Sequence, residues 1–372
     1  MAAKEKIAIK IMKRISITII LCLFCFLIPA FGQNQTEKID SFVREKMKSK
    51  NIPGLSLAIV REGKIVYAKG YGMANLELSV PATEKTVYHI ASVTKTFTAM
   101  ATMMLFEEGK ISLEEPISKY FSDLPEAWRG VKIRHLLNHT SGIKSFSNND
   151  KIPCRVGKSE SEYGRADVLK EVACLPLEFS PGERWSYGDT GYHLLGMLIE
   201  KVSGKDYEQF LNERIFQPLE MRNTRLNSDD QLVTNRADGY NYSDGKFRNA
   251  GLLPLFEFAN AGLISTVLDM AKLDIAFTSE KLLRRATFEQ MMTNAKLNNG
   301  EIVPSYGLGV GLTPFRGRRR VGHTGGGGLG FSTALTHFLN EKVTVVVLTN
   351  TNQPTGSVGE MANEIASFYF SK

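Results

Sequence analysis

The sequence predicts an α+β fold in which one antiparallel sheet is built from both ends of the chain. The sheet is expected to be flanked by helices and interrupted by a large helical insertion. Strand-like segments cluster near both termini, whereas the middle of the chain has helical periodicity. Strands from the two ends must share one sheet if each is to bury its face, so the middle is an insertion and not a second domain in series.

The composition indicates a packed protein. Of 372 residues, 43% are hydrophobic and 23% are charged. These values exclude a disordered chain, a collagen-like chain and a polytopic membrane protein. The formal net charge of +7 suggests an anionic partner such as nucleic acid, so the distribution of that charge matters.

Residues 1–32 have the pattern of a secretory signal. Five basic residues precede an uncharged run from Ile15 to Ile28, and small residues follow near Gly32. The run is about fourteen residues long, which is short for a membrane span of roughly twenty. We expect cleavage near Gln33 and a secreted or periplasmic protein. The alternative is an uncleaved N-terminal anchor, which would be the protein's membrane contact.

Removal of this segment changes the charge and the cysteine count. The mature chain keeps 41 basic and 38 acidic residues, a net charge of +3, which is too small to argue for nucleic acid. Cys154 and Cys174 remain. A disulfide between them is permitted in an oxidising compartment, and two buried free thiols are the alternative.

Both ends of the mature chain contain the expected sheet. A polar helix is predicted at 36–50, and Leu55–Val60 and Ile65–Tyr71 flank a turn and predict a hairpin. The apolar run from Val343 to Leu348 suits a strand that is covered on both faces. The C-terminal strands are predicted at 306–312, 319–323, 330–337 and 342–349, followed by a helix at 357–369.

The middle of the chain supplies the predicted helices. Their ranges are 92–108, 134–138, 166–172, 192–202, 205–215 and 266–277. We therefore expect a single catalytic domain at 33–372. Its mixed part covers about 33–90 and 300–372, and its helical part covers about 91–299.

The tetrad Ser92-Val-Thr-Lys95 is the first candidate for chemistry. Positions i and i+3 share one face of a helix, so the amine can assist the alcohol as a nucleophile. Two further tetrads begin at Ser141 and Ser243, but they lie next to a glycine and an Asp-Gly turn. Only Ser92 begins a long apolar helix, whose positive dipole end favours developing negative charge.

Two further segments complete the pattern. The first runs from Ser180 to Tyr192 and places Tyr187 in a loop between a Pro-Gly turn and a helix. The second runs from Gly322 to Gly330, where glycines beside a strand let a ligand approach backbone N–H groups.

These three elements, in this order, resemble the serine β-lactamase and penicillin-binding protein family. The resemblance is to its class C branch, with the related D,D-peptidases and esterases, whose motifs are S-x-x-K, Y-x-N and K-T-G or H-T-G. Accessory stretches at 136–142, 261–270 and 306–309 fit as well, so the resemblance covers about residues 38–370. It implies a β-lactamase/transpeptidase-like fold.

The resemblance also implies the roles of individual residues. Ser92 corresponds to the acylated nucleophile, Lys95 to its proton-handling partner and Tyr187 to the second acid/base. Which of Lys95 and Tyr187 is the acylation base stays open. The oxyanion hole would use the N–H groups of Ser92 and Gly326, and substrate contacts would come from the other matching positions, Asp189, His323, Thr324 and Gly325.

Two positions depart from the family pattern. Asp189 replaces the Asn of Y-x-N, so it keeps an acceptor and loses the amide donor; the alternative is that it only caps the following helix. His323 replaces the Lys of K-T-G and is only partly charged near neutral pH. Both changes weaken recognition of a penicillin-like substrate.

The sequence therefore predicts a serine hydrolase that needs no cofactor and no metal. Its partner would be a β-lactam, a D-Ala peptide such as a cell-wall peptide, or an ester. A carboxylesterase without a β-lactam role and a non-turnover penicillin-binding sensor are the alternatives. His135 and His139 are interpreted as structural, and the run Arg316–Arg320 as a solvated turn or as a rim that attracts anionic polymers. The oligomeric state stays open.

Overall fold

The computed structural model describes residues 35–148, 164–228, 231–251, 258–327, 330–353 and 357–370. Tertiary contacts divide the chain into two units, residues 1–49 and 50–372. In the first unit, residues 35–49 form a helix, at the place where the sequence predicts one. The second unit contains the sheet and the candidate site.

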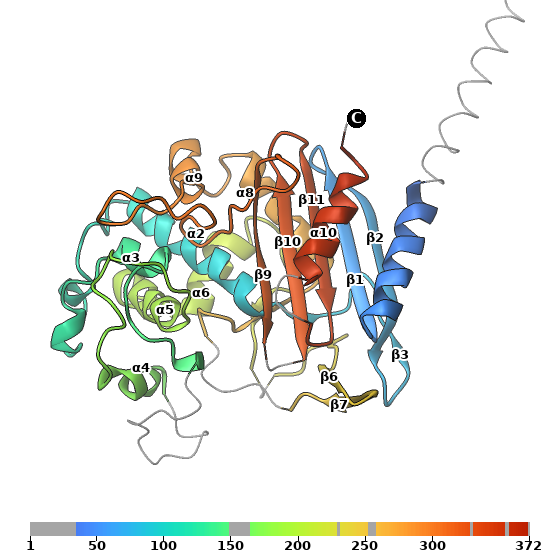
Figure 1. Cartoon of the computed structure of the whole chain (residues 1–372), viewed down its shortest axis with the longest axis horizontal. Coiled ribbons are helices and arrows are strands. Elements are labelled where there is room, and N and C mark those ends of the chain that lie inside the picture. Colours follow the sequence, from blue (N-terminus) through green and yellow to red (C-terminus); the bar gives the residue numbers. More distant parts are fainter. Residues whose placement is uncertain are drawn as a thin grey trace, which may run out of the picture. The chain divides into compact units, whose positions relative to one another are not determined.

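The second unit is built around a six-stranded antiparallel sheet (Figure 1). The strand order β3-β2-β1-β11-β10-β9 places the first strand of the chain beside the last, with Leu57 opposite Val347. The prediction of one sheet from both chain ends is therefore confirmed. The strands are β1 (Gly54–Arg61), β2 (Lys64–Asn75), β3 (Val80–Pro81), β9 (Arg320–Gly327), β10 (Phe331–Phe338) and β11 (Val343–Thr349).

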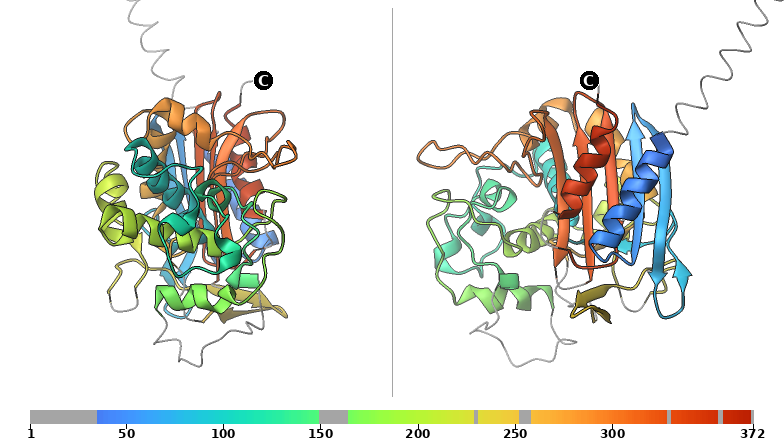
Figure 2. Two further views of the ribbon diagram at one scale, coloured as in Figure 1. Left: turned by 90° about the vertical axis from the view of Figure 1, so that its left-hand side faces the viewer. Right: turned by 45° about the vertical axis from the view of Figure 1, so that its right-hand side comes forward.

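Helices cover both faces of this sheet. The C-terminal helix α10 (Ser357–Ser367) packs on β10 and β11, and α7 (Val267–Ala271) packs against β1 and β11. All residues of β10 and β11 are buried, which explains the apolar run from Val343 to Leu348. Figure 2 shows α10 lying along these strands, while the helical insertion extends beyond β9.

The insertion is centred on α2 (Thr94–Glu107), which is buried on almost every side and packs on α5 (Thr190–Ser203). Because α2 begins beside β9, the N-terminal turn of this helix lies where the sheet meets the insertion. The remaining helices are α3 (Ile133–Leu137), α4 (Arg165–Ala173), α6 (Tyr207–Leu211), α8 (Leu273–Thr278) and α9 (Arg285–Met291), with 3-10 turns at Ala91–Val93, Ile117–Lys119, Glu126–Trp128 and Phe146–Asn148.

Several details differ from the predicted elements. Residues 306–312 form only isolated bridges, and the predicted helix at 266–277 is divided into α7 and α8. A π-helical turn at Asn212–Phe216 follows α6. The insertion is not purely helical, because it also contributes short strands of two to four residues, which are too short to give a sequence alternation. These are β5 (Arg225–Leu226), β6 (Tyr240–Ser243), β7 (Lys246–Asn249) and β8 (Leu263–Ser265), and β8 pairs with β4 (Tyr88–His89), which lies just before the insertion.

Two sequence predictions lie outside the described residues. The signal segment at 1–32 is one of them, and Cys154 is the other. Cys174 is disulfide-bonded. Because Cys154 lies outside the described residues, its pairing with Cys174 stays a prediction. Within the described part of the chain, no helix is both long and apolar enough to cross a bilayer.

Candidate active site

Ser92 lies in the 3-10 turn Ala91–Val93, immediately before α2. The preceding residue, Ala91, has a φ of 47°, a left-handed conformation that is uncommon for a residue with a side chain. Such local strain often marks a functional turn. Here it turns the chain sharply from β4 into α2 and places Ser92 at the positive end of that helix.

Lys95 lies on the first turn of α2, and its side chain is fully buried. Its Nζ donates to Ser92 Oγ at 3.1 Å, to Asp189 Oδ1 at 2.6 Å and to the carbonyl oxygen of Asn260 at 2.9 Å. Burial is the largest single effect and lowers the pKa of Lys95, but the charges of Asp189 and Tyr187 and the hydrogen bonds to both together outweigh it, so the pKa of Lys95 is raised. Lys95 is therefore an ammonium ion whose three N–H bonds all have acceptors.

Asp189 precedes α5, but its carboxylate does not cap that helix. Besides Lys95, it accepts a hydrogen bond of 2.5 Å from Ser147 Oγ, and its backbone N–H donates to Ser145 Oγ at 2.9 Å. Burial raises the pKa of Asp189, but the Lys95 charge and the hydrogen bonds from Lys95 and Ser147 lower it by more, so the pKa is below its usual value. The interpretation as a simple helix cap is wrong, because Asp189 is the counter-ion of Lys95.

Tyr187 lies two residues before Asp189, in the loop that leads to α5. Its ring centroid is 4.9 Å from Lys95 Nζ. Burial raises the pKa of Tyr187 more than the Lys95 charge and hydrogen bonds to Lys95 and Ser92 lower it. At rest, Tyr187 is thus a neutral phenol next to a charged lysine.

The edge strand β9 passes beside the turn that contains Ser92. A Cβ atom added to Gly325 would lie 2.5 Å from the carbonyl oxygen of Ile90, so only glycine fits there. The N–H and C=O of Gly322 both bond Gly311, on the side away from β10. Because a strand alternates with a period of two, the N–H of Gly326 points to the same outer side. This direction is the one that an oxyanion donor beside Ser92 requires.

Thr324 and His323 lie on opposite faces of β9. The methyl group of Thr324 approaches Gly359 of α10, and the described contacts do not connect its hydroxyl to Ser92, Lys95 or Tyr187. A substrate contact through Thr324 therefore stays a prediction.

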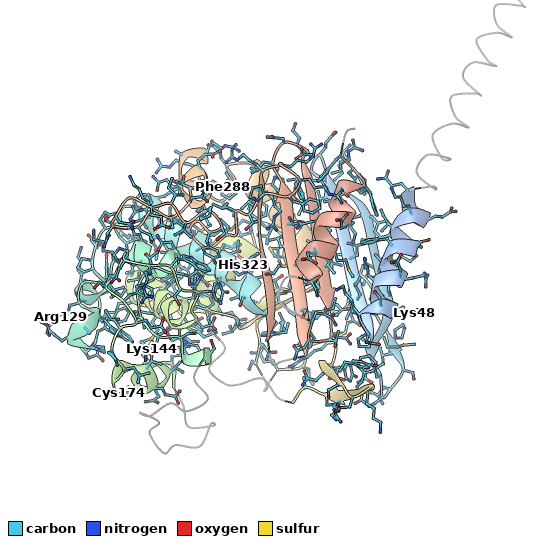
Figure 3. The ribbon with its side chains drawn as sticks, in the orientation of Figure 1. Lys48, Arg129, Lys144, Cys174, Phe288 and His323 are labelled. Atoms are coloured by element: carbon cyan, nitrogen blue, oxygen red, sulfur yellow. The ribbon has the colours of Figure 1, made fainter. Side chains whose placement is uncertain are left out.

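His323 faces the site and is buried, at the position labelled in Figure 3. Its Nδ1 lies 2.6 Å from the carbonyl oxygen of Thr324, which can only accept, so Nδ1 carries the proton. Its Nε2 then accepts from Tyr306 Oη at 2.8 Å. Burial and the nearby Lys95 charge lower the pKa of His323 to about 4. The expectation of a partly charged histidine is corrected here: the ring is neutral near pH 7.

Aromatic rings enclose this group. His139 stacks on Tyr187 with ring centroids 4.3 Å apart, and Tyr306 lies 4.8 Å from His139. Trp185 is 36% exposed and forms the outer edge of the cluster, 6.2 Å from Tyr306. The surface beside Tyr187 is consequently aromatic and carries no unpaired cation among these residues.

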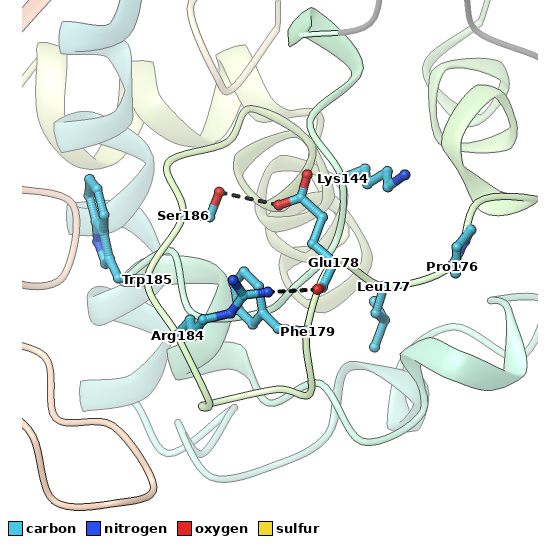
Figure 4. A pocket seen from close by; sticks show the side chains of 8 residues that line it. All are labelled: Lys144, Pro176, Leu177, Glu178, Phe179, Arg184, Trp185 and Ser186. Atoms are coloured by element: carbon cyan, nitrogen blue, oxygen red, sulfur yellow. Dashed lines mark hydrogen bonds between the residues drawn. The ribbon is translucent and has the colours of Figure 1, made fainter.

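A cavity of about 490 Å³ borders the loop that carries Tyr187 (Figure 4). Its walls are Lys144, residues 176–179 and residues 184–186, and they include none of Ser92, Lys95 and Tyr187. Ser186 Oγ donates to the Glu178 carboxylate at 3.2 Å, and Arg184 donates to the Glu178 carbonyl at 2.9 Å. These bonds fold the loop against itself. We place the chemistry at Ser92 and regard this cavity as its neighbour.

Two of the four arginines in the basic run Arg316–Arg320 are paired with carboxylates. Arg316 forms two hydrogen bonds to the carboxylate of Glu364, at 2.9 and 2.8 Å, and Arg318 pairs with Glu341. The arrangement favours the interpretation as a solvated turn over that of an anion-attracting rim.

The structure also supplies residues that sequence reasoning did not assign. Ser145 and Ser147 hold Asp189, and Asn260 offers its carbonyl oxygen to Lys95. Asn260 directly precedes the accessory stretch at 261–270, which was a usable signal. The two serines carry no such signal, because a Ser-x-Ser pair in a loop is common.

The chain is similar to known proteins over most of its length. A family model described as Beta-lactamase matches residues 39–370. Penicillin-binding protein 4* of Bacillus subtilis is 28% identical over 342 residues, 87% of this chain and 73% of that protein. Protein flp of Staphylococcus aureus is 31% identical, but the match spans 55% of this chain and only 41% of that protein.

Solved structures give a similar result. The octameric penicillin-binding protein homologue from Pyrococcus abyssi has a TM-score of 0.73 and 32% identity, covering 90% of this chain and 76% of that chain. The D-amino acid amidase from Ochrobactrum anthropi SV3 has a TM-score of 0.77 at 23% identity, covering 90% and 98%, which shows a shared fold.

Proposed function

The chain belongs to the β-lactamase family, a family of serine hydrolases, and from this premise we propose that it is an exported enzyme that hydrolyses uncharged amides or esters through an acyl-enzyme at Ser92. The observation that carries the proposal is the contact of Lys95 Nζ with both Ser92 Oγ, at 3.1 Å, and Asp189 Oδ1, at 2.6 Å. It joins a nucleophile, a buried cation and a counter-ion in one chain of hydrogen bonds.

The hydrogen bonds of Lys95 support Tyr187 as the acylation base. All three N–H bonds of Lys95 are donated, so Lys95 cannot accept the proton of Ser92 in this state. Tyr187, in its phenolate form, takes that proton as Ser92 Oγ bonds to the carbonyl carbon of the substrate. Lys95 stabilises the negative charge of the serine oxygen throughout.

The same tyrosine completes the cycle. Tyr187 returns the proton to the departing amine or alcohol, and the C–N or C–O bond breaks to leave the acyl-enzyme. A water molecule then gives a proton to Tyr187 and attacks the ester carbon. The C–O bond to Ser92 breaks as Tyr187 passes that proton to Ser92 Oγ, which releases the acid and restores the serine hydroxyl. The N–H groups of Ser92 and Gly326 bind the oxyanion in both steps, a contribution of about 3 kcal/mol for each donor.

The charge balance indicates the substrate class. Asp189 compensates Lys95, and His323 is neutral, so the described residues at the site offer no free cation to a substrate carboxylate. β-Lactams carry such a carboxylate. Neutral esters, amides and peptides without a carboxylate next to the scissile bond fit better. The similarity to penicillin-binding proteins keeps a cell-wall peptide among the candidates.

A substrate panel tests this proposal. The purified mature chain is assayed with a short-chain p-nitrophenyl ester, a D-amino acid amide, a D-Ala-D-Ala peptide and nitrocefin. Labelling by a fluorophosphonate probe, which reacts with activated serines, is measured in parallel. Ester or amide turnover should exceed nitrocefin turnover, and Ser92→Ala should abolish both turnover and labelling.

Ser141→Ala is the matched control, because Ser141 also begins an S-x-x-K tetrad but its hydroxyl only accepts the N–H of Ile143. It should leave turnover unchanged. Turnover that survives Ser92→Ala would refute the mechanism. A stable penicilloyl adduct without turnover of any substrate would instead support a sensor.

A further inference from the structure

His139 holds Tyr187 from both sides. The backbone N–H of Ser186 donates to the carbonyl oxygen of His139 at 2.9 Å, and the N–H of Gly188 donates to His139 Nδ1 at 3.3 Å. One residue thus bonds both chain neighbours of Tyr187. The His139 ring also stacks on the Tyr187 ring, with centroids 4.3 Å apart and planes 38° apart.

The backbone of His139 is shaped for this contact. Its φ is 60°, a left-handed conformation that is uncommon outside glycine and that histidine, like asparagine and aspartate, adopts more often than other residues. The conformation lies just beyond the short helix α3, in the stretch 136–142. A buried residue that makes three separate contacts with one segment fixes the position of that segment.

The protonation state of His139 follows from its partners. Nδ1 accepts from Gly188, so the neutral ring carries its proton on Nε2. Burial and the nearby Lys95 charge hold the pKa of His139 well below its usual value. Nε2 is buried without a hydrogen-bond partner among the described residues, which costs free energy.

We propose that His139 is a positioning residue that fixes the Tyr187 ring beside Lys95 and excludes water from its inner face. The inference depends on the proposed function, in which Tyr187 transfers protons to and from Ser92. Tyr187 lies in a loop, and a displacement of about 1 Å at a reacting group can cost roughly a hundredfold in rate. The contacts of His139 prevent such a displacement.

Two substitutions separate the contacts. His139→Asn keeps an acceptor and tolerates the left-handed backbone but removes the stacked ring. His139→Phe keeps a ring and removes the acceptor. We expect each to lower kcat at least tenfold with KM changed less than threefold. In His139→Asn, water reaches Tyr187, so its pKa falls and the alkaline rise of the pH–rate profile moves to lower pH.

His135→Asn is the matched control. His135 is also buried, and its Nδ1 also accepts a backbone N–H, from Lys132 at 3.2 Å, but no described contact joins it to Tyr187. It should lower the free energy of unfolding and leave kcat and the pH profile unchanged.

The outcomes are distinct. Normal kcat and an unshifted profile in His139→Asn, while Ser92→Ala is inactive, would overturn this inference and leave the proposed function standing. An equal loss of kcat in His135→Asn would show a general structural effect and would overturn it too. Activity that persists in Ser92→Ala would overturn both.

Discussion

Replacement of Asp189 by Asn tests the ion pair on which the electrostatics of the site depend. The change is nearly isosteric, and the amide oxygen can still accept from Lys95. It removes one negative charge 2.6 Å from a lysine Nζ whose side chain is fully buried. Without its counter-ion, Lys95 either stays charged in a buried position or releases its proton. Both outcomes lower the free energy of unfolding, because the folded state loses the ion pair.

The magnitude follows from the geometry. At an effective dielectric constant of about 20, opposite unit charges 2.6 Å apart attract by about 6 kcal/mol. Part of that attraction only offsets the cost of burying both charges, and removal of one partner of a buried pair typically costs about 3–5 kcal/mol. Because Asn retains an acceptor, we expect a loss of about 3 kcal/mol, or about 4 °C in Tm for a chain of this length.

The assay is urea and thermal unfolding from pH 4 to pH 10. The lowered pKa of Asp189 gives a stabilisation that is lost as the pH falls below about 4, and the raised pKa of Lys95 gives one that is lost only above about pH 10. If Lys95 keeps its charge in Asp189→Asn, the difference between wild type and variant should be constant from about pH 5 to pH 9. If burial without the counter-ion makes Lys95 release its proton, the variant gains stability as the pH rises and the difference shrinks toward about pH 10.

Asp244→Asn is the matched control, since Asp244 pairs with Arg248 at 3.4 Å but its side chain is 83% exposed. That substitution should cost less than about 1 kcal/mol. If Asp189→Asn costs no more than Asp244→Asn at pH 7, the reasoning that Asp189 stabilises a buried lysine cation is refuted.

Three further predictions concern activity. For a neutral ester, kcat/KM should rise with pH through the neutral range, because Tyr187 acts as the base and its pKa is raised. The negative charge of Asp189 helps to raise that pKa, so in Asp189→Asn the increase in kcat/KM should move to lower pH. A flat pH profile would contradict the assignment of Tyr187 as the base. Combining Asp189→Asn with His323→Lys should raise cephalosporin kcat/KM by about tenfold, equal to about 1.4 kcal/mol, and an unchanged value would show that these positions do not select against carboxylates. Gly325→Ala should slow fluorophosphonate labelling by roughly a hundredfold, because its Cβ would displace the turn before the nucleophile. Gly130→Ala, whose Cβ would meet no atom within 4 Å, should label normally, and equal rates would argue against close approach of β9.

The sheet was predictable from the sequence because long strands have strong local signals. The apolar run at Val343–Leu348 and the hairpin at 55–71 identify strands at both ends, and the need to bury their faces brings them together. The short strands of the insertion and the division of residues 266–277 into α7 and α8 were missed. Strands of two to four residues are too short to show alternating polar and apolar side chains. The break between α7 and α8 is set by tertiary packing and not by local helix propensity.

The sequence by itself determined the family, the fold class and the identity of the central side chains. Ser92 and Lys95 share a helix, and their spacing of three places them on one face wherever that helix packs. The tertiary structure alone decided the charge state of the site. Asp189, Ser147 and His139 come from separate loops, and only folding brings them to Lys95 and Tyr187. A pKa depends on burial and on charges within a few ångströms, which a linear sequence does not contain.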